Sequence, residues 1–326
     1  MTVASAPGKV VLCGEYAVLD GAAAICMAVG GRAVASVSPS RGQTHRVLAP
    51  GYTKCEGEFR SSTDGIEWLR GEDEFKLVDA VWRVAKLKSD TACTIVLDTG
   101  KFVDVPTGTR FGIGSSAALT VALTLALTDA ATDKNLLKTA SRAHAAMQGG
   151  VGSGVDIACS VSGGLIEYRM EGARANSLQW PESLAYRLLW TGVETSTAAK
   201  LKALQAAVVH QSRAELQSAA NAMAEAWRSG TARNVMAAYP DYIQVLQRFS
   251  VDHDLGVFDA GHGQLVDAAI KADLIYKPCG AGGGDVGILF GTDEARLDAF
   301  VKKDVMAAFS LLDCDIDYSG ARIEET

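Results

Sequence analysis

Three glycine-rich segments combine backbone freedom with hydroxyl and carboxylate groups, which is a combination that suits phosphate binding. They are Phe111–Ser116, Gly149–Asp156 and Gly280–Asp285. Glycines allow tight turns and let a ligand approach the backbone, and successive N–H groups in such turns form concave anion sites. Any one of them is also compatible with a plain structural turn. Together they predict a site for a nucleoside triphosphate, whose phosphates need many N–H donors.

The first of these segments leads into a helix predicted from about Ala117. The first N–H groups of a helix lack partners within it, and the helix dipole places partial positive charge there, so phosphate is favoured. The hydroxyls of Ser115 and Ser116 can cap this helix or ligate Mg²⁺. Phe111–Thr128 is uncharged and long enough for a membrane span. We reject that alternative because the run begins with Gly-Ile-Gly-Ser-Ser and contains three threonines within it.

Several polar side chains have both a structural and a chemical interpretation. Lys9 is either a surface lysine or a cation directed at a transferred phosphoryl group, and Asp156 either caps a segment or acts as a base or orienting group. Asp285 is interpreted as structural and His144 as a packed helix residue. Hydroxyls that either cap a helix or touch a substrate are those of Thr191, Ser196 and Thr197.

Composition narrows the class of protein. The chain has 326 residues, 48% of them apolar and 21% charged, which predicts two domains with substantial cores. The net charge of −7 argues against nucleic-acid binding, so an anionic substrate requires a local cluster of donors. Seven scattered cysteines without a CxxC pair, and an N-terminus without a signal-peptide layout, favour a cytoplasmic protein with reduced thiols. We expect no membrane partner, and either a monomer or a homodimer.

The order of elements predicts an α+β protein whose first half mixes strands and helices and whose second half is rich in helices with a small sheet. We place the boundary in the polar stretch 169–183, giving domains 1–175 and 176–326. Strands are expected at 9–13, 33–39, 93–97, 165–168, 186–190, 286–290 and 315–323. Helices are expected from 117, and at 74–86, 135–148, 195–209, 213–228, 233–249 with a break at Pro240, 262–272 and 294–302.

Three motifs resemble those of the GHMP kinases, a superfamily of small-molecule kinases that includes galactokinase, homoserine kinase, mevalonate kinase and phosphomevalonate kinase. In chain order they are Ala6-Pro-Gly-Lys-Val10 with Gly14-Glu-Tyr-Ala-Val18, Gly112-Ile-Gly-Ser-Ser-Ala-Ala118, and Gly280-Ala-Gly-Gly-Gly-Asp285. The resemblance implies an N-terminal ribosomal-protein-S5-like α/β domain and a C-terminal α+β ferredoxin-like domain. It also implies that the second motif holds ATP between them.

Within this superfamily the segments 277–287 and 143–158 resemble the phosphomevalonate kinases. Mevalonate kinases carry a Mg²⁺-binding Glu eleven residues before the Asp that corresponds to Asp156, and here that position is Ala145. A phosphate acceptor has a second pKa near 6 and is mostly a ready nucleophile at pH 7, so it needs alignment and charge neutralisation more than a base. The resemblance therefore implies ATP-dependent phosphorylation of 5-phosphomevalonate to 5-diphosphomevalonate, in isoprenoid precursor synthesis.

Other members of the superfamily, such as mevalonate kinase, homoserine kinase or a decarboxylase-like enzyme, stay open as alternatives. So does a catalytically silent sensor of the same fold. The resemblance implies that Lys9 bridges the γ-phosphoryl group and the acceptor, that Asp156 holds Lys9 and the substrate hydroxyl, and that Ser116 ligates Mg²⁺.

The implied cofactors are ATP and Mg²⁺, and the partner is a small phosphorylated substrate. The implied ATP-binding residues are Arg110, Gly112, Gly114, Ser115, Ser116 and Ala117. The implied substrate-binding residues are Lys9, Tyr16, Ser153, Gly154, Asp156, Thr197, Gly280, Ala281, Gly282 and Gly283. Lys101 is a second basic residue that could hold the substrate's phosphate.

Overall fold

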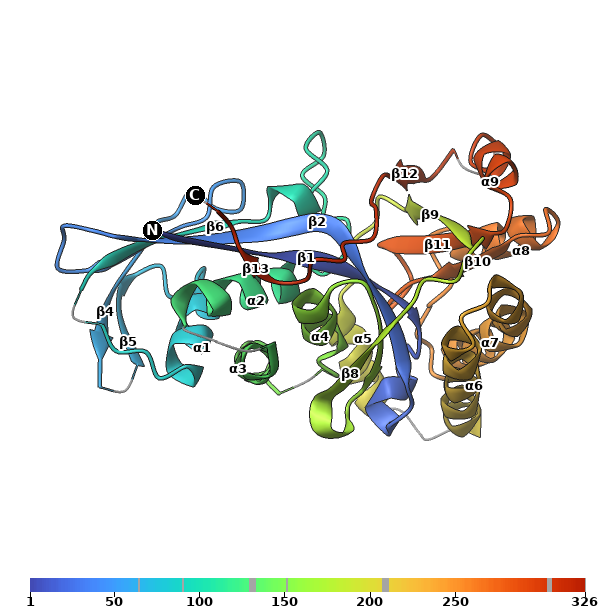
Figure 1. Ribbon diagram of the computed structural model, residues 1–326, viewed down its shortest axis with the longest axis horizontal. Helices are drawn as coiled ribbons and strands as arrows, with labels where there is room; N and C mark the ends of the chain where they lie inside the picture. The colour runs from blue at the N-terminus through green and yellow to red at the C-terminus, as the bar shows by residue number, and fades with distance from the viewer. Residues whose placement is uncertain are drawn as a thin grey trace.

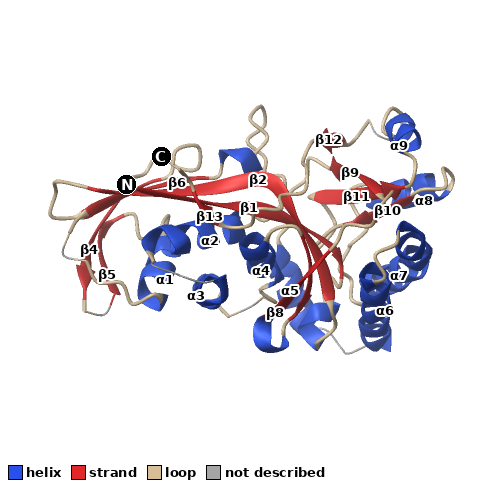
Figure 2. Ribbon diagram, viewed as in Figure 1, coloured by secondary structure: helices blue, strands red, loops and turns tan. Residues whose placement is uncertain are grey.

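The protein is elongated, and two β-sheets follow one another along its long axis (Figure 1). The computed structural model describes residues 1–63, 65–89, 91–128, 133–150, 152–206, 211–303 and 307–325. Helices cover one face of the first sheet and surround the second (Figure 2). The described residues thus form a mixed helix-and-strand fold, which confirms the predicted fold class.

The first sheet is built on two long antiparallel strands, β1 (Thr2–Cys13) and β2 (Ala24–Pro39), in which Lys9 lies opposite Ala28. In the described part of the chain it contains nine strands, ordered β13-β1-β2-β6-β3-β4-β5, with β7 and β8 attached beside β2. The remaining strands are β3 (His45–Leu48), β4 (Gly57–Ser62), β5 (Gly65–Arg70), β6 (Cys93–Asp98), β7 (Leu165–Arg169), β8 (Arg174–Leu178) and β13 (Arg322–Ile323).

The strand predicted at 9–13 begins earlier in the structure, since β1 starts at Thr2 and passes through Pro7. The register of β1 against β2 shifts between Pro7 and Gly8. Proline has no N–H to donate to a ladder and is tolerated at such an irregularity. The shift also sets Gly8 against the loop of the second motif, where a Cβ on Gly8 would lie 2.7 Å from the carbonyl oxygen of Ile113.

Four helices lie on one face of the first sheet: α1 (Lys76–Val84), α2 (Ser115–Leu127), α3 (Asp133–Met147) and α4 (Val155–Ser162). α2 is apolar and packs between the sheet and α3. Its buried threonines are satisfied locally, since the hydroxyl of Thr120 donates to the Ser116 carbonyl and that of Thr124 to the Thr120 carbonyl. Within the described ranges, no helix combines the length and apolar character needed to cross a bilayer.

The second sheet is ordered β10-β11-β9-β12 and is surrounded by the later helices. Its strands are β9 (Ala185–Trp190), β10 (Ile275–Pro278), β11 (Val286–Gly291) and β12 (Ser310–Leu312). The helices are α5 (Thr197–Ala206), α6 (Gln211–Arg228), α7 (Ala232–Asp252), α8 (His262–Ile270) and α9 (Glu294–Phe300). Tyr239 of α7 stacks on Phe290 of β11, with ring centroids 5.1 Å apart, and thereby joins the helices to the sheet.

Two predictions about these elements are wrong. α7 runs through Pro240 without a break. Proline removes one intrahelical hydrogen bond, but the neighbouring Tyr239 and Tyr242 are buried against the core, so tertiary packing preserves the helix. The predicted strand 315–323 is mostly irregular, because only residues 322–323 pair with β1. The predicted helix 195–209 is α5, and its residues 207–209 lie outside the described ranges.

The first sheet includes β8 and, through β13, residues near the C-terminus. The predicted boundary between domains 1–175 and 176–326 falls inside β8. The C-terminal segment is fixed to the first sheet by Arg32, whose Nη1 lies 2.5 Å from Asp317 Oδ2 and whose Nη2 donates to the Gly320 carbonyl. We propose that the N-terminal domain comprises residues 1–178 together with the segment that returns to it from Asp315. The second domain then comprises the residues between these two segments.

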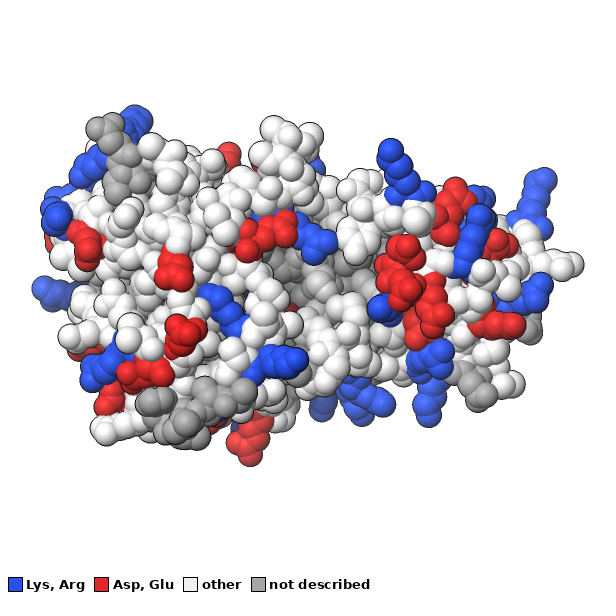
Figure 3. All heavy atoms as spheres, turned by 180° about the vertical axis from the view of Figure 1, so that it is seen from behind, with Lys and Arg blue, Asp and Glu red and all other residues white. Residues whose placement is uncertain are grey.

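Charged side chains of both signs are intermixed over the face shown in Figure 3. The pattern agrees with the modest negative net charge of the sequence. Such a surface has no strong field of one sign to attract a polyanion, so binding of anions depends on donors gathered locally.

A buried ion pair joins the two halves of the protein. Glu15 follows β1 and contacts the ammonium group of Lys277 on β10, and neither side chain is more than 2% exposed. Tyr242 of α7 donates to Glu15 Oε2 at 2.5 Å and accepts from the Gly14 N–H at 2.8 Å. Burial opposes the charged form of Lys277, but the Glu15 carboxylate together with Cys279 and Cys13 outweighs it, so the pKa of Lys277 lies above its ordinary value.

We expect Lys277→Met to destabilise the protein by about 3–5 kcal/mol, because it leaves the Glu15 carboxylate buried without its partner. Adding Glu15→Gln removes the orphaned charge and should restore part of this loss. The free energy of unfolding, measured by urea denaturation at pH 7, checks both variants. If Lys277→Met costs less than about 1 kcal/mol, the pair does not hold the two halves together.

Candidate active site

A cavity of about 470 Å³ opens between the two halves of the protein and is lined by parts of all three motifs. Its walls come from the end of β1, the first turns of α2, α4 and α5, the inner face of α3, and the loop after β10. These elements are far apart in sequence and meet because β1 reaches from the first sheet into the contact with α7 and β10. A cavity of this size is typical of small-molecule sites.

The second motif forms the loop before α2. Gly112 and Gly114 have φ values of 77° and 84°, which favour glycine. A Cβ on Gly114 would lie 3.0 Å from the Lys9 side chain, so the loop needs glycine to pass beneath that lysine. The N–H of Lys9 also donates to the Ile113 carbonyl at 2.8 Å. Gly114 is the N-cap of α2 and offers no side chain to cap it, so the first turn of the helix stays available to a ligand.

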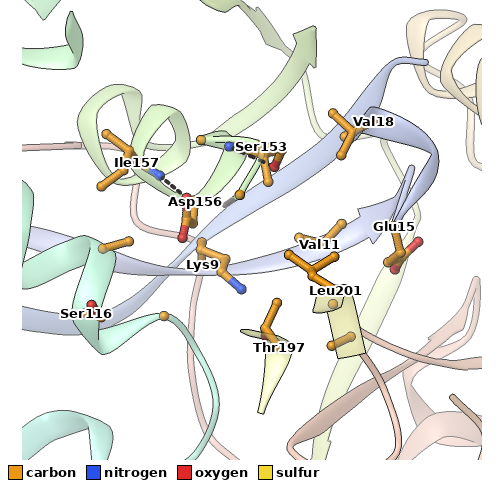
Figure 4. Close-up of a pocket in the computed structure, with 18 of the residues that line it drawn as sticks. Lys9, Val11, Glu15, Val18, Ser116, Ser153, Asp156, Ile157, Thr197 and Leu201 are labelled. Carbon is orange, nitrogen blue, oxygen red and sulfur yellow. Dashed lines mark hydrogen bonds between the residues drawn. The ribbon is translucent and has the colours of Figure 1, made fainter. Parts of the chain in front are cut away.

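Lys9, Asp156 and Thr197 surround one space in the cavity (Figure 4). Lys9 comes from β1, Asp156 from the first turn of α4, and Thr197 from the first turn of α5. Asp156 Oδ1 accepts the Ile157 N–H at 2.9 Å, which fixes the carboxylate, and its side chain is 26% exposed. A cation and a carboxylate from different elements therefore face the same volume.

The second glycine-rich turn places Asp156 at the start of α4. Gly154 is the N-cap of this helix and has a φ of 78°. Tyr168 of β7 donates from its hydroxyl to the Ser153 carbonyl at 2.7 Å, and the Val155 N–H donates to the Ser153 hydroxyl at 3.3 Å. The turn is thus held to the first sheet. Val151, within the predicted segment 149–156, lies outside the described residues.

The third motif is held against the first by hydrogen bonds to its carbonyls. Tyr16 donates from its hydroxyl to the Ala281 carbonyl at 2.7 Å, and Lys200 of α5 donates to the Gly282 carbonyl at 2.8 Å. Burial and the Glu15 carboxylate raise the pKa of the Tyr16 phenol, so it stays a donor. Burial also lowers the pKa of Lys200 below its ordinary value.

Asp285 ends the third motif and lies directly against the second. A Cβ on Gly112 would fall 2.2 Å from the Asp285 carboxyl carbon, so the two loops touch here. Asp285 Oδ1 accepts the Thr195 N–H at 3.2 Å. Burial raises the pKa of Asp285 to about 6 even though this hydrogen bond, and then the cation of Lys9, oppose the rise. Asp285 also lines the cavity, so its position is more than that of a turn cap.

The structure gathers most of the predicted site residues around the cavity. Those that line it are Lys9, Tyr16, Arg110, Gly112, Gly114, Ser115, Ser116, Ala117, Ser153, Gly154, Asp156, Thr197, Gly280 and Ala281. Gly282, Gly283 and Lys101 do not belong to the described lining. A Cβ on Gly282 would lie 2.5 Å from the Val257 carbonyl oxygen, and the Gly283 N–H donates to that same carbonyl. These two glycines pack the loop against the second domain.

Four polar residues of the site were missed or interpreted as structural from the sequence. Glu15, Asp285 and His144 line the cavity, and Lys200 holds the loop that closes it. His144 is buried, as expected of a packed residue, but its Nε2 also lies 3.2 Å from Ser116 Oγ. The spacing of His144 and Gln148, one turn apart before a glycine-rich turn, is a signal that could have suggested a polar face.

A metal ion would need ligands beyond this chain. The described residues include no cluster of three or more acidic, His or Cys side chains that could hold one. Mg²⁺ commonly keeps water ligands and binds through few protein groups together with substrate phosphates. The exposed hydroxyl of Ser116, on the uncapped first turn of α2, fits that arrangement and a triphosphate beside it.

Comparisons with known proteins agree with this geometry. Residues 77–164 match the family model of the GHMP kinases N terminal domain. The chain is 29% identical to phosphomevalonate kinase of Streptomyces sp. (strain CL190), over 93% of this chain and 91% of that protein.

Among solved structures, a protein of Listeria innocua has a TM-score of 0.86 at 20% identity, with 100% of both chains covered. Streptococcus pneumoniae phosphomevalonate kinase, in complex with phosphomevalonate and AMPPNP, has a TM-score of 0.78 at 17% identity, with 97% and 100% covered. The structural likenesses establish the fold, and the motifs around the cavity agree with the family match. Residues 77–164 match the N-terminal domain of the GHMP kinases, and the chain as a whole is similar to a phosphomevalonate kinase.

Proposed function

We propose that this chain transfers the γ-phosphoryl group of ATP to the phosphate of 5-phosphomevalonate, giving 5-diphosphomevalonate. The observation that carries the proposal is the position of Lys9, which lies across Gly114 of the loop before α2 and faces the same space as Asp156. A cation placed between a phosphate-binding loop and a second pocket stabilises negative charge during phosphoryl transfer. The similar Streptomyces protein is a phosphomevalonate kinase.

The loop before α2 suits the triphosphate. Its helix N-terminus is open and favours anions, and Ser116 and Arg110 line the same part of the cavity. Arg110 is held by its main chain, whose N–H donates to Glu194 Oε1 at 2.7 Å, and its guanidinium lies 5.6 Å from the centre of the Tyr52 ring. Bound ATP would supply the phosphoryl group, and Mg²⁺ at Ser116 would neutralise charge on its phosphates.

The acceptor side of the cavity is bounded by Asp156, Thr197 and the loop containing Gly280 and Ala281. Asp156 is fixed by the Ile157 N–H and can orient Lys9 and a substrate hydroxyl. Because Ala145 also lines the cavity, this wall lacks a carboxylate at the position where mevalonate kinases carry one. A phosphate acceptor is already anionic at pH 7, so alignment and charge neutralisation matter more here than proton removal.

The first prediction concerns the acceptor. In an assay that couples ADP release to a dye, with ATP and Mg²⁺ present, we expect turnover with 5-phosphomevalonate and none with mevalonate or homoserine. Turnover with mevalonate instead would show that the protein is a kinase, but that Ala145 does not exclude mevalonate as the acceptor. Release of ADP with none of these acceptors, despite nucleotide binding, would favour the silent sensor.

The second prediction concerns the two charged residues at the centre of the cavity. Lys9→Met and Asp156→Asn should each lower kcat by about 10²–10⁴-fold, because they remove charge stabilisation and orientation at the reacting groups. Matched controls are Lys88→Met and Asp267→Asn, which make the same chemical changes on the exposed surface and should stay close to the wild-type rate. If the control variants lowered kcat as much as Lys9→Met and Asp156→Asn do, the assignment of Lys9 and Asp156 to the active site would be wrong.

The third prediction concerns Asp285, whose burial raises its pKa to about 6. The folded state then binds this proton more tightly than the unfolded state, so the carboxyl favours folding at low pH and loses that advantage as the pH rises through 6. Between pH 5 and pH 8 the wild type should lose about 1 kcal/mol of stability relative to Asp285→Asn, which cannot ionise. Urea denaturation of both proteins across this range measures the difference, and a constant difference would contradict the prediction.

A further inference from the structure

His144 connects two of the residues around the cavity. It lies on α3, is 4% exposed, and its ring reaches between α2 and α4. Its Nε2 is 3.2 Å from Ser116 Oγ and 3.2 Å from Gln148 Nε2, while its Nδ1 is 3.9 Å from Asp156 Oδ2. Both ring nitrogens of a buried imidazole therefore face polar groups that line the cavity.

The contacts favour one position for the ring proton. The Gln148 amide nitrogen, as oriented in the structure, can only donate, so His144 Nε2 must carry a lone pair toward it. The neutral ring then has its proton on Nδ1, on the side of the Asp156 carboxylate. The Ser116 hydroxyl faces the same single lone pair on Nε2, so it donates there as a second donor that shares the lone pair with Gln148.

We propose that His144 is a positioning residue for Ser116: its Nε2 accepts the Ser116 hydroxyl proton, so that the Ser116 oxygen turns its lone pairs toward the cavity and the metal of a bound nucleotide. This inference rests on the proposed function, because it assumes that Ser116 ligates the Mg²⁺ that accompanies ATP. A hydroxyl rotates freely and is a good ligand only when its proton points away from the cation. His144 supplies the acceptor that holds the proton away.

Orientation matters here because, among the described residues, no group of three or more His, Cys, Asp or Glu side chains could hold the metal. The cavity wall has alanine at position 145, and the described residues contain no acidic cluster that could bind the cation alone. A single neutral ligand must then be correctly oriented, as groups that align metal ligands contribute substantially to metal affinity. The Asp156 carboxylate, 3.9 Å from Nδ1 on the far side of the imidazole, favours the tautomer that carries its proton there and accepts at Nε2.

Two conservative variants separate the two ring nitrogens. In His144→Gln the end of the side chain reaches the position of Nε2, where its amide oxygen can accept from Ser116. In His144→Asn the shorter amide reaches only the position of Nδ1, so the contact with Ser116 is lost while the one toward Asp156 is kept. Ser116→Ala removes the ligand itself and sets the lower limit for the effect of magnesium on nucleotide affinity.

Isothermal titration calorimetry with ADP, in excess Mg²⁺ and in EDTA, gives the gain in affinity due to magnesium for each protein. We expect His144→Asn to reduce this gain about tenfold, toward that of Ser116→Ala, and His144→Gln to keep it within about threefold of the wild type. Affinity for ADP in EDTA should be the same in His144→Asn and His144→Gln. The double variant Ser116→Ala with His144→Asn should lose no more than Ser116→Ala, because both act on one interaction.

A purely structural histidine would give a different result. Loss of packing would weaken ADP binding equally in Mg²⁺ and in EDTA, and His144→Gln would then be no better than His144→Asn. Either outcome overturns the proposal, as does a full magnesium gain in His144→Asn. The measurement needs no acceptor, so it separates the proposed metal site from the proposed role of His144. If magnesium does not raise the affinity of the wild type for ADP, the metal site of the proposed function is contradicted as well. If magnesium raises the affinity equally in the wild type and in both His144 variants, only the inference about His144 is contradicted.

Discussion

The contact between Glu15 and Lys277 is the constraint on which the rest of the structure depends. Two charges this deeply buried carry a large desolvation cost and are stable only as a hydrogen-bonded pair, here completed by Tyr242. The carboxylate follows β1 immediately and the ammonium lies on β10, so the pair fixes the first motif against the strand that leads into the third. The cavity lies in front of this pair, and Glu15 itself belongs to its wall.

Three glycines in or beside the cavity lie so close to other segments that a side chain in their place would crowd them. Gly8 lies against the Ile113 carbonyl, Gly114 passes beneath Lys9, and Gly112 lies against Asp285. Glycine at each of these positions therefore serves the contact between loops as well as the conformation of a turn. This explains how the three motifs, which are distant in the chain, can lie against one another around one site.

Much of the fold could be predicted from local patterns in the sequence. Helices with apolar spacing, such as the one at 213–228, and short apolar strands, such as the one at 286–290, agree with α6 and β11 to within two residues. The failures come from tertiary effects that a local pattern does not contain. Packing of Tyr239 and Tyr242 keeps α7 intact through Pro240, and hydrogen bonding across a bulge extends β1 through Pro7.

The site could be predicted in part, because the motifs name residues that converge. Fourteen of the predicted residues line one cavity. The sequence could not show that Asp285 touches Gly112, that Lys200 holds the Gly282 carbonyl, or that His144 reaches Ser116, since each contact depends on how separate elements pack. The motif that they share with Gly280 predicts that Gly282 and Gly283 contact the substrate. In the structure, the backbones of these two glycines lie against Val257.

The pairing of β13 with β1 has a consequence for how the protein is made. Residues 322–323 lie opposite residues 4–5, so this edge of β1 stays uncovered until a segment far later in the chain has been synthesised. Contacts this distant in sequence form late, and domains otherwise tend to fold from the N-terminus during synthesis. The cavity likewise needs Thr197 and Gly280. A nascent chain therefore holds an uncovered edge of β1 until residues 322–323 have been made, and an incomplete site until Gly280 has been made.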